Sequence, residues 1–278
     1  MLVGTPIGNL GDLSQRAREV LRDAAVICCE DTRRTRALLS AMELNTSPKR
    51  LWAVHDHNEV AQIEAVCNLV IAGQLVAVVT DAGTPGVADP GSRLVAAAHD
   101  RGLTVSIVPG PSAAIDALVV SGQPTDRFMF EGFLPRKGRA RAVRIASLLH
   151  EERTTILFES PNRIAETLND LVEALGSARS ATVVRELTKV HETITRAPLG
   201  ELASRFAVGE VKGEVVLVVG PGTPAELDAE AVDEALLAGL QRGERMKDVA
   251  RSVATTFQID QRATYDRALE LRESSPGS

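Results

Sequence analysis

The chain contains 278 residues, of which 44% are hydrophobic and 24% charged, a composition typical of a globular protein large enough for two domains. The formal net charge of -6 argues against a nucleic-acid binder that relies on global positive charge, so RNA contact would need a local basic patch. Three cysteines, an odd number, argue against a disulfide framework and favour a reducing compartment. Because no apolar run approaches the roughly 20 residues that span a bilayer, and the start lacks a signal-peptide pattern, we expect a cytoplasmic protein with no membrane partner.

Short apolar runs alternate with amphipathic stretches through the first 220 residues. This alternation predicts a mainly parallel sheet covered by helices, with a first α/β domain at residues 1–124. The adjacent Cys28 and Cys29 are interpreted as strand residues, and the first strand is so short that we expect the natural start to lie upstream. The predicted strands are Leu2–Val3, Ala25–Cys29, Arg50–Val54, Leu75–Val79 and Thr104–Val108, and the predicted helices are Ser14–Ala24, Arg33–Met42, Val60–Ala72 and Ser92–Arg101.

A second α/β domain is predicted at residues 125–220, followed by a linker and a small three-helix extension at residues 221–278. The linker is indicated by the proline and glycine of Pro221–Pro224, and the extension resembles a helix-turn-helix unit. The predicted strands are Arg127–Phe130, Thr154–Glu159, Ala181–Arg185, His191–Arg196 and Glu214–Val219, and the predicted helices are Ala140–His150, Arg163–Leu175, Leu199–Val208, Ala229–Gln241, Met246–Phe257 and Arg262–Leu271.

Two loops rich in glycine and proline, Leu2–Asp12 and Val79–Gly91, each follow a predicted strand and precede a predicted helix. Open α/β sheets bind their ligands at the carboxyl ends of such strands, and glycine lets the backbone approach a ligand closely. Neither loop is a G-x-G-x-x-G turn or a G-x-x-x-x-G-K-[ST] phosphate cradle. The loops therefore predict a small-molecule site that is not an ordinary dinucleotide or ATP site.

Asp81 follows a predicted strand directly, where its carboxylate can pair with a cationic part of a ligand while nearby backbone N–H groups hold a carboxylate or ribose. The alternative is a plain turn in which Asp81 caps the next helix. Pro109–Ala113 closes the following strand in the same way. Ser112 and the first helical amides suit a polar ligand group, or the segment is simply a rigid helix entry.

Glu30–Arg34 also follows a strand, and its two acids and two arginines suit either a polar substrate or a surface ion-pair cluster. Thr32 is expected to cap the helix that comes next. His55–Glu59 contains a His-x-His spacing without a further ligand, so we predict helix capping by Asp56 or Asn58 and no metal site.

The densest positive stretch is Pro135–Arg141, followed by Arg144, in an otherwise acidic chain. Such a loop beside a cleft suits contact with a phosphate backbone, although an isolated charge run is often only a solvated surface. Phe158–Pro161 and Arg185–Lys189 end two strands of the second predicted domain, where they form either the opposite wall of a cleft or buried polar contacts of the fold.

Taken together and in order, these motifs resemble the ribosomal RNA small subunit methyltransferase I family, the bacterial 16S rRNA cytidine 2′-O-methyltransferases of the tetrapyrrole methylase superfamily. The resemblance spans essentially the whole chain, and the ordered set is more specific than any single motif. It is carried by Thr5–Asp12, Glu30–Arg33, His55–Glu59, Thr80 with Asp81–Pro85, Asp126–Phe128, Glu131–Pro135, Phe158–Ser160 with Arg163, and Arg185–Lys189.

The resemblance implies two α/β domains of the tetrapyrrole methylase type, S-adenosyl-L-methionine in the cleft between them, and a homodimer. Where the superfamily has a G-D-P triplet, this chain has Gly83-Thr84-Pro85, so an acidic contact must move to Asp81 or be lost. Carried onto matching positions, the implied cofactor contacts are Pro6, Asp81, Ala82, Gly83, Thr84, Ser112, Ala113, Glu159 and Leu187.

The implied substrate is the ribose 2′-hydroxyl of a cytidine in 16S rRNA, with the assembled 30S subunit as the expected partner. A ribose hydroxyl is a weak nucleophile, so in-line positioning and a carboxylate base are expected, with Asp31 as the first candidate and Glu186 as the second. The predicted RNA contacts are Arg33, Arg136, Lys137, Arg139 and Arg141. Two alternatives are a tetrapyrrole methyltransferase of the same fold and a non-catalytic, ribosome-associated nucleotide-binding module.

Overall fold

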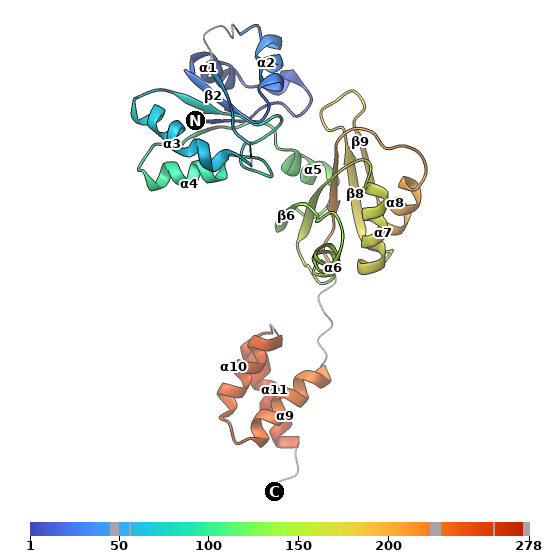
Figure 1. The fold of residues 1–278 in the computed structure, drawn as a ribbon. Helices are drawn as coiled ribbons and strands as arrows, with labels where there is room; N and C mark the ends of the chain where they lie inside the picture. Colours follow the sequence, from blue (N-terminus) through green and yellow to red (C-terminus); the bar gives the residue numbers. More distant parts are fainter. Residues whose placement is uncertain (45–49, 56, 223–228, 258, 275–278) are drawn as a thin grey trace. The chain divides into compact units, whose positions relative to one another are not determined.

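The computed structural model describes residues 1–44, 50–55, 57–222, 229–257 and 259–274 (Figure 1). The chain divides into two compact units, Met1–Gly222 and Thr223–Ser278. Asp56, residues 223 and 224 of the predicted linker, and the last four residues lie outside the described part. Within the described ranges, no helix combines the length and apolar character needed to span a membrane.

The first sheet is parallel throughout, as the alternation of strands and helices predicts. Its strand order is β3-β2-β4-β1-β5, which places the amino-terminal strand between two later ones. The strands are β1 (Leu2–Val3), β2 (Val26–Cys29), β3 (Arg50–Ala53), β4 (Val76–Val78) and β5 (Ile107–Val108).

Helices cover both faces of this sheet because its central strands are apolar on both sides. In β2, Ile27 and Cys29 belong to the core under α1 (Gln15–Asp23) and α2 (Thr32–Ala41). The alternate residues Val26 and Cys28 belong to the core under α3 (Glu59–Ile71) and α4 (Ser92–Asp100). Both cysteines are buried in a strand, as predicted. A short 3-10 helix, η1 (Leu10–Asp12), lies within the first loop.

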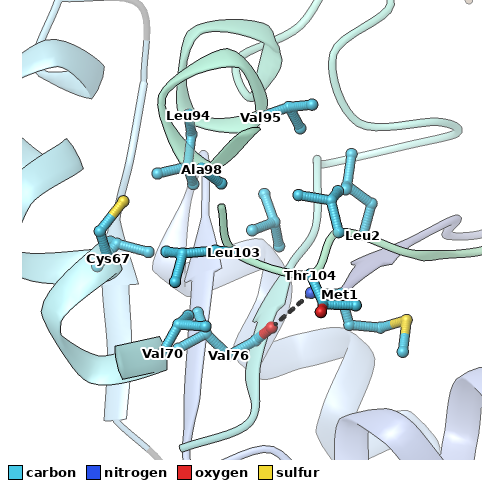
Figure 2. Close-up of a pocket in the computed structure, with 13 residues that line it drawn as sticks. Met1, Leu2, Cys67, Val70, Val76, Leu94, Val95, Ala98, Leu103 and Thr104 are labelled. Carbon is cyan, nitrogen blue, oxygen red and sulfur yellow. Dashed lines mark hydrogen bonds between the residues drawn. The ribbon is translucent and has the colours of Figure 1, made fainter. Parts of the chain in front are cut away.

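An apolar hollow of about 50 Å³ lies in the core beneath α3 and α4 (Figure 2). Cys67 and Val70 line it from α3, Leu94 and Ala98 line it from α4, and the Met1 amino group donates a hydrogen bond to the carbonyl of Val76 at 3.0 Å. Its size and apolar lining mark a packing gap of the core rather than a binding site.

The second sheet has the order β6-β7-β10-β8-β9, and here the prediction of a mainly parallel sheet is wrong. The pair β6–β7 is parallel, whereas β7–β10, β10–β8 and β8–β9 are antiparallel. The short connection 186–192 between β8 and β9 permits an antiparallel hairpin and is too short for a parallel crossover. The strands are β6 (Phe128–Phe133), β7 (Thr154–Glu159), β8 (Ser180–Arg185), β9 (Thr193–Pro198) and β10 (Val215–Val219).

The two faces of the second sheet are covered by different helices. On one face lie α6 (Arg139–Ala146), α7 (Ile164–Leu175) and α8 (Leu199–Phe206), whose leucines form the largest buried core. The other face is covered by α5 (Ala113–Ser121), where Ala114, Ala117 and Leu118 pack against β7, β8 and β10. Helix α5 thus continues from β5 of the first sheet and joins the core of the second.

The carboxy-terminal unit consists of α9 (Ala229–Gln241), α10 (Met246–Phe257) and α11 (Gln261–Ser274). Its core contains Leu236 from α9, Val253 from α10 and Ala268 from α11. An ion pair of 2.6 Å between Arg267 and Asp233 links α11 to α9. The three helices appear where the sequence predicts them.

Candidate active site

Three loops of the first sheet meet at its carboxyl edge. The backbones of Thr5 and Gly83 exchange two hydrogen bonds, of 2.9 and 3.1 Å, so the two glycine-proline loops are joined directly. The loop after β5 approaches equally closely, because a Cβ atom on Gly4 would lie 2.7 Å from the Cα of Gly110. The glycines therefore allow the ends of β1, β4 and β5 to form one continuous surface.

A pocket of about 560 Å³ lies over these loops and extends to the ends of strands in the second sheet. This volume is typical of small-molecule sites. Both the Asp81 loop and Phe158–Pro161, predicted as the facing wall, contribute to it. Its lining residues are Ile7, Glu30, Arg34, Asp81, Ala82, Gly83, Thr84, Val87, Ala88, Asp89, Ser112, Ala113, Phe133, Phe158, Glu159, Ser160, Pro161, Gly213, Glu214, Val215 and Val216.

The pocket brings together most of the residues predicted to contact the cofactor. Those on its surface are Asp81, Ala82, Gly83, Thr84, Ser112, Ala113 and Glu159. Pro6 and Leu187 are not among the described residues that line it, nor are the predicted bases Asp31 and Glu186. The backbone at Gly83 has φ +86°, a left-handed conformation that favours glycine at this point of the floor.

The Asp81 carboxylate binds residues at the start of α2 and does not cap the helix that follows its own loop. Its Oδ1 atom accepts a hydrogen bond of 3.2 Å from the backbone N–H of Asp31, and its Oδ2 atom lies 3.4 Å from Nε of Arg34. Both Asp81 and Arg34 line the pocket. A carboxylate and a guanidinium thus share one wall, where they can bind charged groups of a ligand.

Asp31 is the N-cap of α2, so the prediction that Thr32 caps this helix is wrong. The Asp31 Oδ1 atom accepts the backbone N–H of Arg33 at 2.8 Å, while Thr32 is the first helical residue. The Arg33 guanidinium donates to the same carboxylate, with Nη2 to Oδ2 at 2.7 Å. These hydrogen bonds stabilise the charged form and hold the pKa of Asp31 well below its usual range.

Glu186 is held by hydrogen bonds to Lys189 and Glu214. Its Oε1 atom accepts hydrogen bonds from Nζ of Lys189 at 2.8 Å and from the backbone N–H of Glu214 at 2.9 Å, and these lower the pKa of Glu186. A Cβ atom on Gly213, whose φ is +88°, would collide with the Glu186 carboxyl group. Glu186 therefore shapes the backbone of Gly213 and Glu214, which do line the pocket.

Glu159 is a buried carboxylate at the end of β7. Its Oε1 atom accepts the backbone N–H of Ser160 at 2.7 Å, and its Oε2 atom accepts the hydroxyl of Thr167 at 2.5 Å. Beside it, the ring of Phe158 makes edge contacts with Phe130 and Phe133 at centroid separations of 4.9 and 5.6 Å. The second sheet thus contributes two aromatic rings, Phe133 and Phe158, and the hydrogen-bonded carboxylate of Glu159 to the pocket.

The basic segment divides into exposed and buried members. Arg136, Lys137 and Arg139 are exposed. The Arg141 side chain is only 6% exposed and donates to Asp170 at 2.7 Å and to the Thr167 hydroxyl at 2.9 Å, so its prediction as an RNA contact is wrong. Arg141 and Ile145 are the buried residues of α6, one helical turn apart, which turns Arg141 toward α7.

Two parts of the lining were missed as site residues. Glu30 stands next to Asp31 and directly follows β2, so the same strand-end signal pointed to both residues. Gly213–Val216 lie at the amino end of β10, which is antiparallel to β7 and β8 and so starts where those strands end. The rule that ligands bind at the carboxyl ends of strands therefore does not indicate this segment, which lies at the amino end of its strand.

The turn before α3, which contains His55 and His57, is closed by a hydrogen bond within the turn itself. Asn58 occupies the N-cap position, but its Oδ1 atom accepts the backbone N–H of His55 at 2.8 Å and caps no helical N–H, so capping by Asn58 is wrong in that sense. No group of three metal-type ligands occurs among the described residues.

The fold consists of two five-stranded sheets covered by helices, and a pocket lies at the ends of their strands. The family model of the tetrapyrrole (corrin/porphyrin) methylases matches residues 1–203. The chain belongs to this family of methyltransferases.

Curated relatives narrow the class further. The chain is 44% identical over 281 aligned residues to "Ribosomal RNA small subunit methyltransferase I" of Mycobacterium tuberculosis, covering 100% of this chain and 96% of the relative. Proteins of the same name from Xylella fastidiosa and Escherichia coli O157:H7 are 48% and 43% identical, covering 84% and 97% of this chain and 84% and 94% of the relatives. Within the tetrapyrrole methylases, the chain belongs to the ribosomal RNA small subunit methyltransferase I family.

Solved structures share the fold at lower identity. The methyltransferase CobJ superposes with a TM-score of 0.59 at 18% identity, covering 79% of this chain and 92% of that one. Uroporphyrin-III C-methyl transferase from Thermus thermophilus, solved in complex with S-adenosyl homocysteine, gives a TM-score of 0.53 at 21% identity, covering 79% and 95%. The predicted fold class is therefore confirmed.

Proposed function

We propose that this protein transfers a methyl group from S-adenosyl-L-methionine to the ribose 2′-hydroxyl of a cytidine in 16S ribosomal RNA. The observation that carries the proposal is the pocket at the carboxyl edge of the first sheet, in a chain that matches ribosomal RNA methyltransferases along its whole length. Those relatives are named for small-subunit rRNA, and their names support the substrate class.

The residues of the pocket fit S-adenosyl-L-methionine in size and chemistry. Its volume of about 560 Å³ suits a nucleoside with an amino-acid tail, and Ile7, Val216 and Phe158 offer apolar surface to an adenine ring. Asp81 provides negative charge for the cationic groups of the donor. When bound, the donor supplies an electrophilic methyl group, and the chain's own residues orient it.

The RNA would approach over exposed cations rather than over a globally basic surface. Arg33, Arg136, Lys137 and Arg139 are exposed and can pair with phosphates. The contacts of α6 remove Arg141 from this set, because its side chain is buried and its charge is paired with Asp170. We propose that the RNA is methylated within the assembled 30S subunit. We also propose that the enzyme acts as a homodimer.

The transfer requires that the 2′-hydroxyl lose its proton as its oxygen attacks the methyl carbon. In-line positioning of the two substrates supplies much of the acceleration, and a carboxylate that accepts the proton supplies more. Asp31 and Glu186 are the acceptors predicted from sequence, but both carboxylates are engaged in fixed hydrogen bonds and neither is among the described residues that line the pocket.

The test is mass-spectrometric mapping of 16S rRNA from a strain that lacks the gene, before and after incubation with purified protein and S-adenosyl-L-methionine. We expect one ribose-methylated cytidine to be absent before and present after, with 30S subunits a better substrate than free rRNA. The matched control is rRNA from the parent strain, which should accept no further methyl group. A methyl group on a base, or transfer to a tetrapyrrole and not to RNA, would overturn the proposal.

A further inference from the structure

Several carboxylates line the pocket, and most are already engaged. Glu159 accepts two hydrogen bonds, from Ser160 and Thr167, and Asp81 is bound by the backbone of Asp31 and by Arg34. Glu214 pairs with Lys189 at 2.9 Å, and Asp89 has an interaction partner of its own. A carboxylate whose lone pairs are occupied by donors is a poor acceptor for a further proton.

Glu30 is in a different position. It follows the last residue of β2 and lines the pocket beside Arg34 and Asp81. Its Oε2 atom accepts a hydrogen bond of 3.3 Å from the hydroxyl of Thr80, which is buried at the end of β4. Within the described part of the chain, its Oε1 atom accepts no hydrogen bond. One oxygen is thus oriented by the sheet, while the other is available to a ligand in the pocket.

The carboxylate of the adjacent Asp31, unlike that of Glu30, is fully engaged by Arg33. Its carboxylate receives the backbone N–H of Arg33 and both Nε and Nη2 of the same residue, at distances from 2.7 to 3.2 Å. It also lies outside the pocket lining. Of two neighbouring acids at one strand end, Asp31 therefore holds the helix and Glu30 faces the site.

The geometry points to Glu30 as the residue that accepts the proton of the attacking hydroxyl, with Thr80 as the positioning residue that orients it. This inference rests on the proposed function. In the step, the ribose oxygen forms a bond to the methyl carbon, the bond between that carbon and the sulfonium sulfur breaks, and its electron pair stays on sulfur as a neutral thioether. The hydroxyl proton passes to Glu30 and from there to solvent.

The experiment compares Glu30→Gln with Asp31→Asn. Glutamine keeps the size and the acceptor for Thr80 but cannot take a proton as a carboxylate does. Asparagine removes the charge of Asp31 but remains a good N-cap, so α2 stays intact. Glu64→Gln on the exposed face of α3 is the matched control for a glutamate-to-glutamine change. Each variant is assayed for single-turnover methylation of unmodified 30S subunits and, separately, for binding of S-adenosyl-L-methionine by calorimetry.

We expect Glu30→Gln to slow methyl transfer by about 100-fold or more, the usual contribution of a general base, while donor affinity stays within about 3-fold of wild type. Glu64→Gln should match wild type, and Asp31→Asn should transfer at least about ten times faster than Glu30→Gln. Glu30→Asp should recover part of the rate.

Three results would overturn the inference. The first is a large rate loss in Asp31→Asn with Glu30→Gln near wild type, which would make Asp31 the acceptor. The second is near-wild-type transfer in Glu30→Gln, and the third is a rate loss that follows lost donor binding. If instead the wild-type protein binds the donor and methylates no RNA, the proposed function itself fails, and the inference about Glu30 fails with it.

Discussion

Replacing Glu59 with alanine is expected to destabilise the first unit and loosen one wall of the pocket. Glu59 is the first residue of α3, and it is only 2% exposed. Its Oε1 atom accepts the backbone N–H groups of Gly91 and Leu94, both at 3.0 Å, at the start of α4. Gly91 ends the loop whose residues Val87 and Asp89 line the pocket, so one buried carboxylate ties this loop to the scaffold.

The magnitude follows from these two hydrogen bonds. A hydrogen bond to a charged group contributes about 1.5–3 kcal/mol, and removing the acceptor leaves two N–H groups without their partner. Allowing for water that enters the space, we expect Glu59→Ala to lose about 3 kcal/mol of unfolding free energy. For a unit of this size, that corresponds to a fall in Tm of about 6–12 °C. Glu59→Gln keeps a neutral acceptor and should lose about 1 kcal/mol.

Differential scanning fluorimetry with and without S-adenosyl-L-methionine measures both consequences. Glu59→Ala should melt earlier and should also gain less from the donor, because the loop that it anchors belongs to the pocket. Glu64→Ala, an exposed change on the same helix, should stay within about 0.5 kcal/mol of wild type. If Glu59→Ala melts within about 1 °C of wild type, the carboxylate does not hold the loop and the reasoning is wrong.

Three further predictions address the basic segment, the pocket floor and pH. Arg141→Ala should lower Tm, with a loss of about 2 kcal/mol from its buried contacts, whereas Arg139→Ala should leave Tm unchanged and weaken RNA binding with a shallower salt dependence in filter binding. Gly83→Ala should weaken calorimetric donor binding, because a φ of +86° costs alanine about 1 kcal/mol. The hydrogen bond from Arg153 lowers the pKa of Glu151 from 4.5 to about 2, so its contribution to stability is present above pH 4.5 and is lost as the pH falls toward 2. Melting curves of Glu151→Gln should therefore show a smaller fall in Tm between pH 5 and pH 3, and an unchanged slope would contradict this.

Most of the helices and strands were predictable because they have strong local signals in the sequence. The run Val26–Cys29 is apolar on both faces, as a buried central strand requires, and Ser14 caps α1 by accepting the N–H of Ala17. The direction of the second sheet was not predictable in this way. The residues of β10, Val215–Val219, form the same apolar pattern whether the neighbouring strands run parallel or antiparallel to them.

The site residues were predictable where the residue type itself marks a strand end. They were not predictable where their role depends on hydrogen-bond partners or on the direction of neighbouring strands. Gly83 and Ser112 stand out because glycine and helix-start residues mark strand ends. Glu30 and Asp31 are adjacent carboxylates, and they are told apart only by the hydrogen bonds that Arg33 makes to Asp31 and Thr80 makes to Glu30. Gly213 reaches the pocket because β10 runs antiparallel to its neighbours, a fact of tertiary structure.

The interior position of β1 in the first sheet also affects how the chain folds during synthesis. Leu2 pairs with Val78 and Ile107, and Val3 pairs with Val108, so β1 waits for partners that lie about 75 and about 105 residues later in the chain. At 5–20 residues per second, ribosomal synthesis of that stretch takes about 5–20 s. The first loop of the pocket has neither neighbouring strand until β4 emerges, and it has only one until β5 follows. The first sheet therefore cannot fold stepwise from β1. The pocket floor is thus completed late, when β5 emerges and pairs with the side of β1 that β4 leaves open.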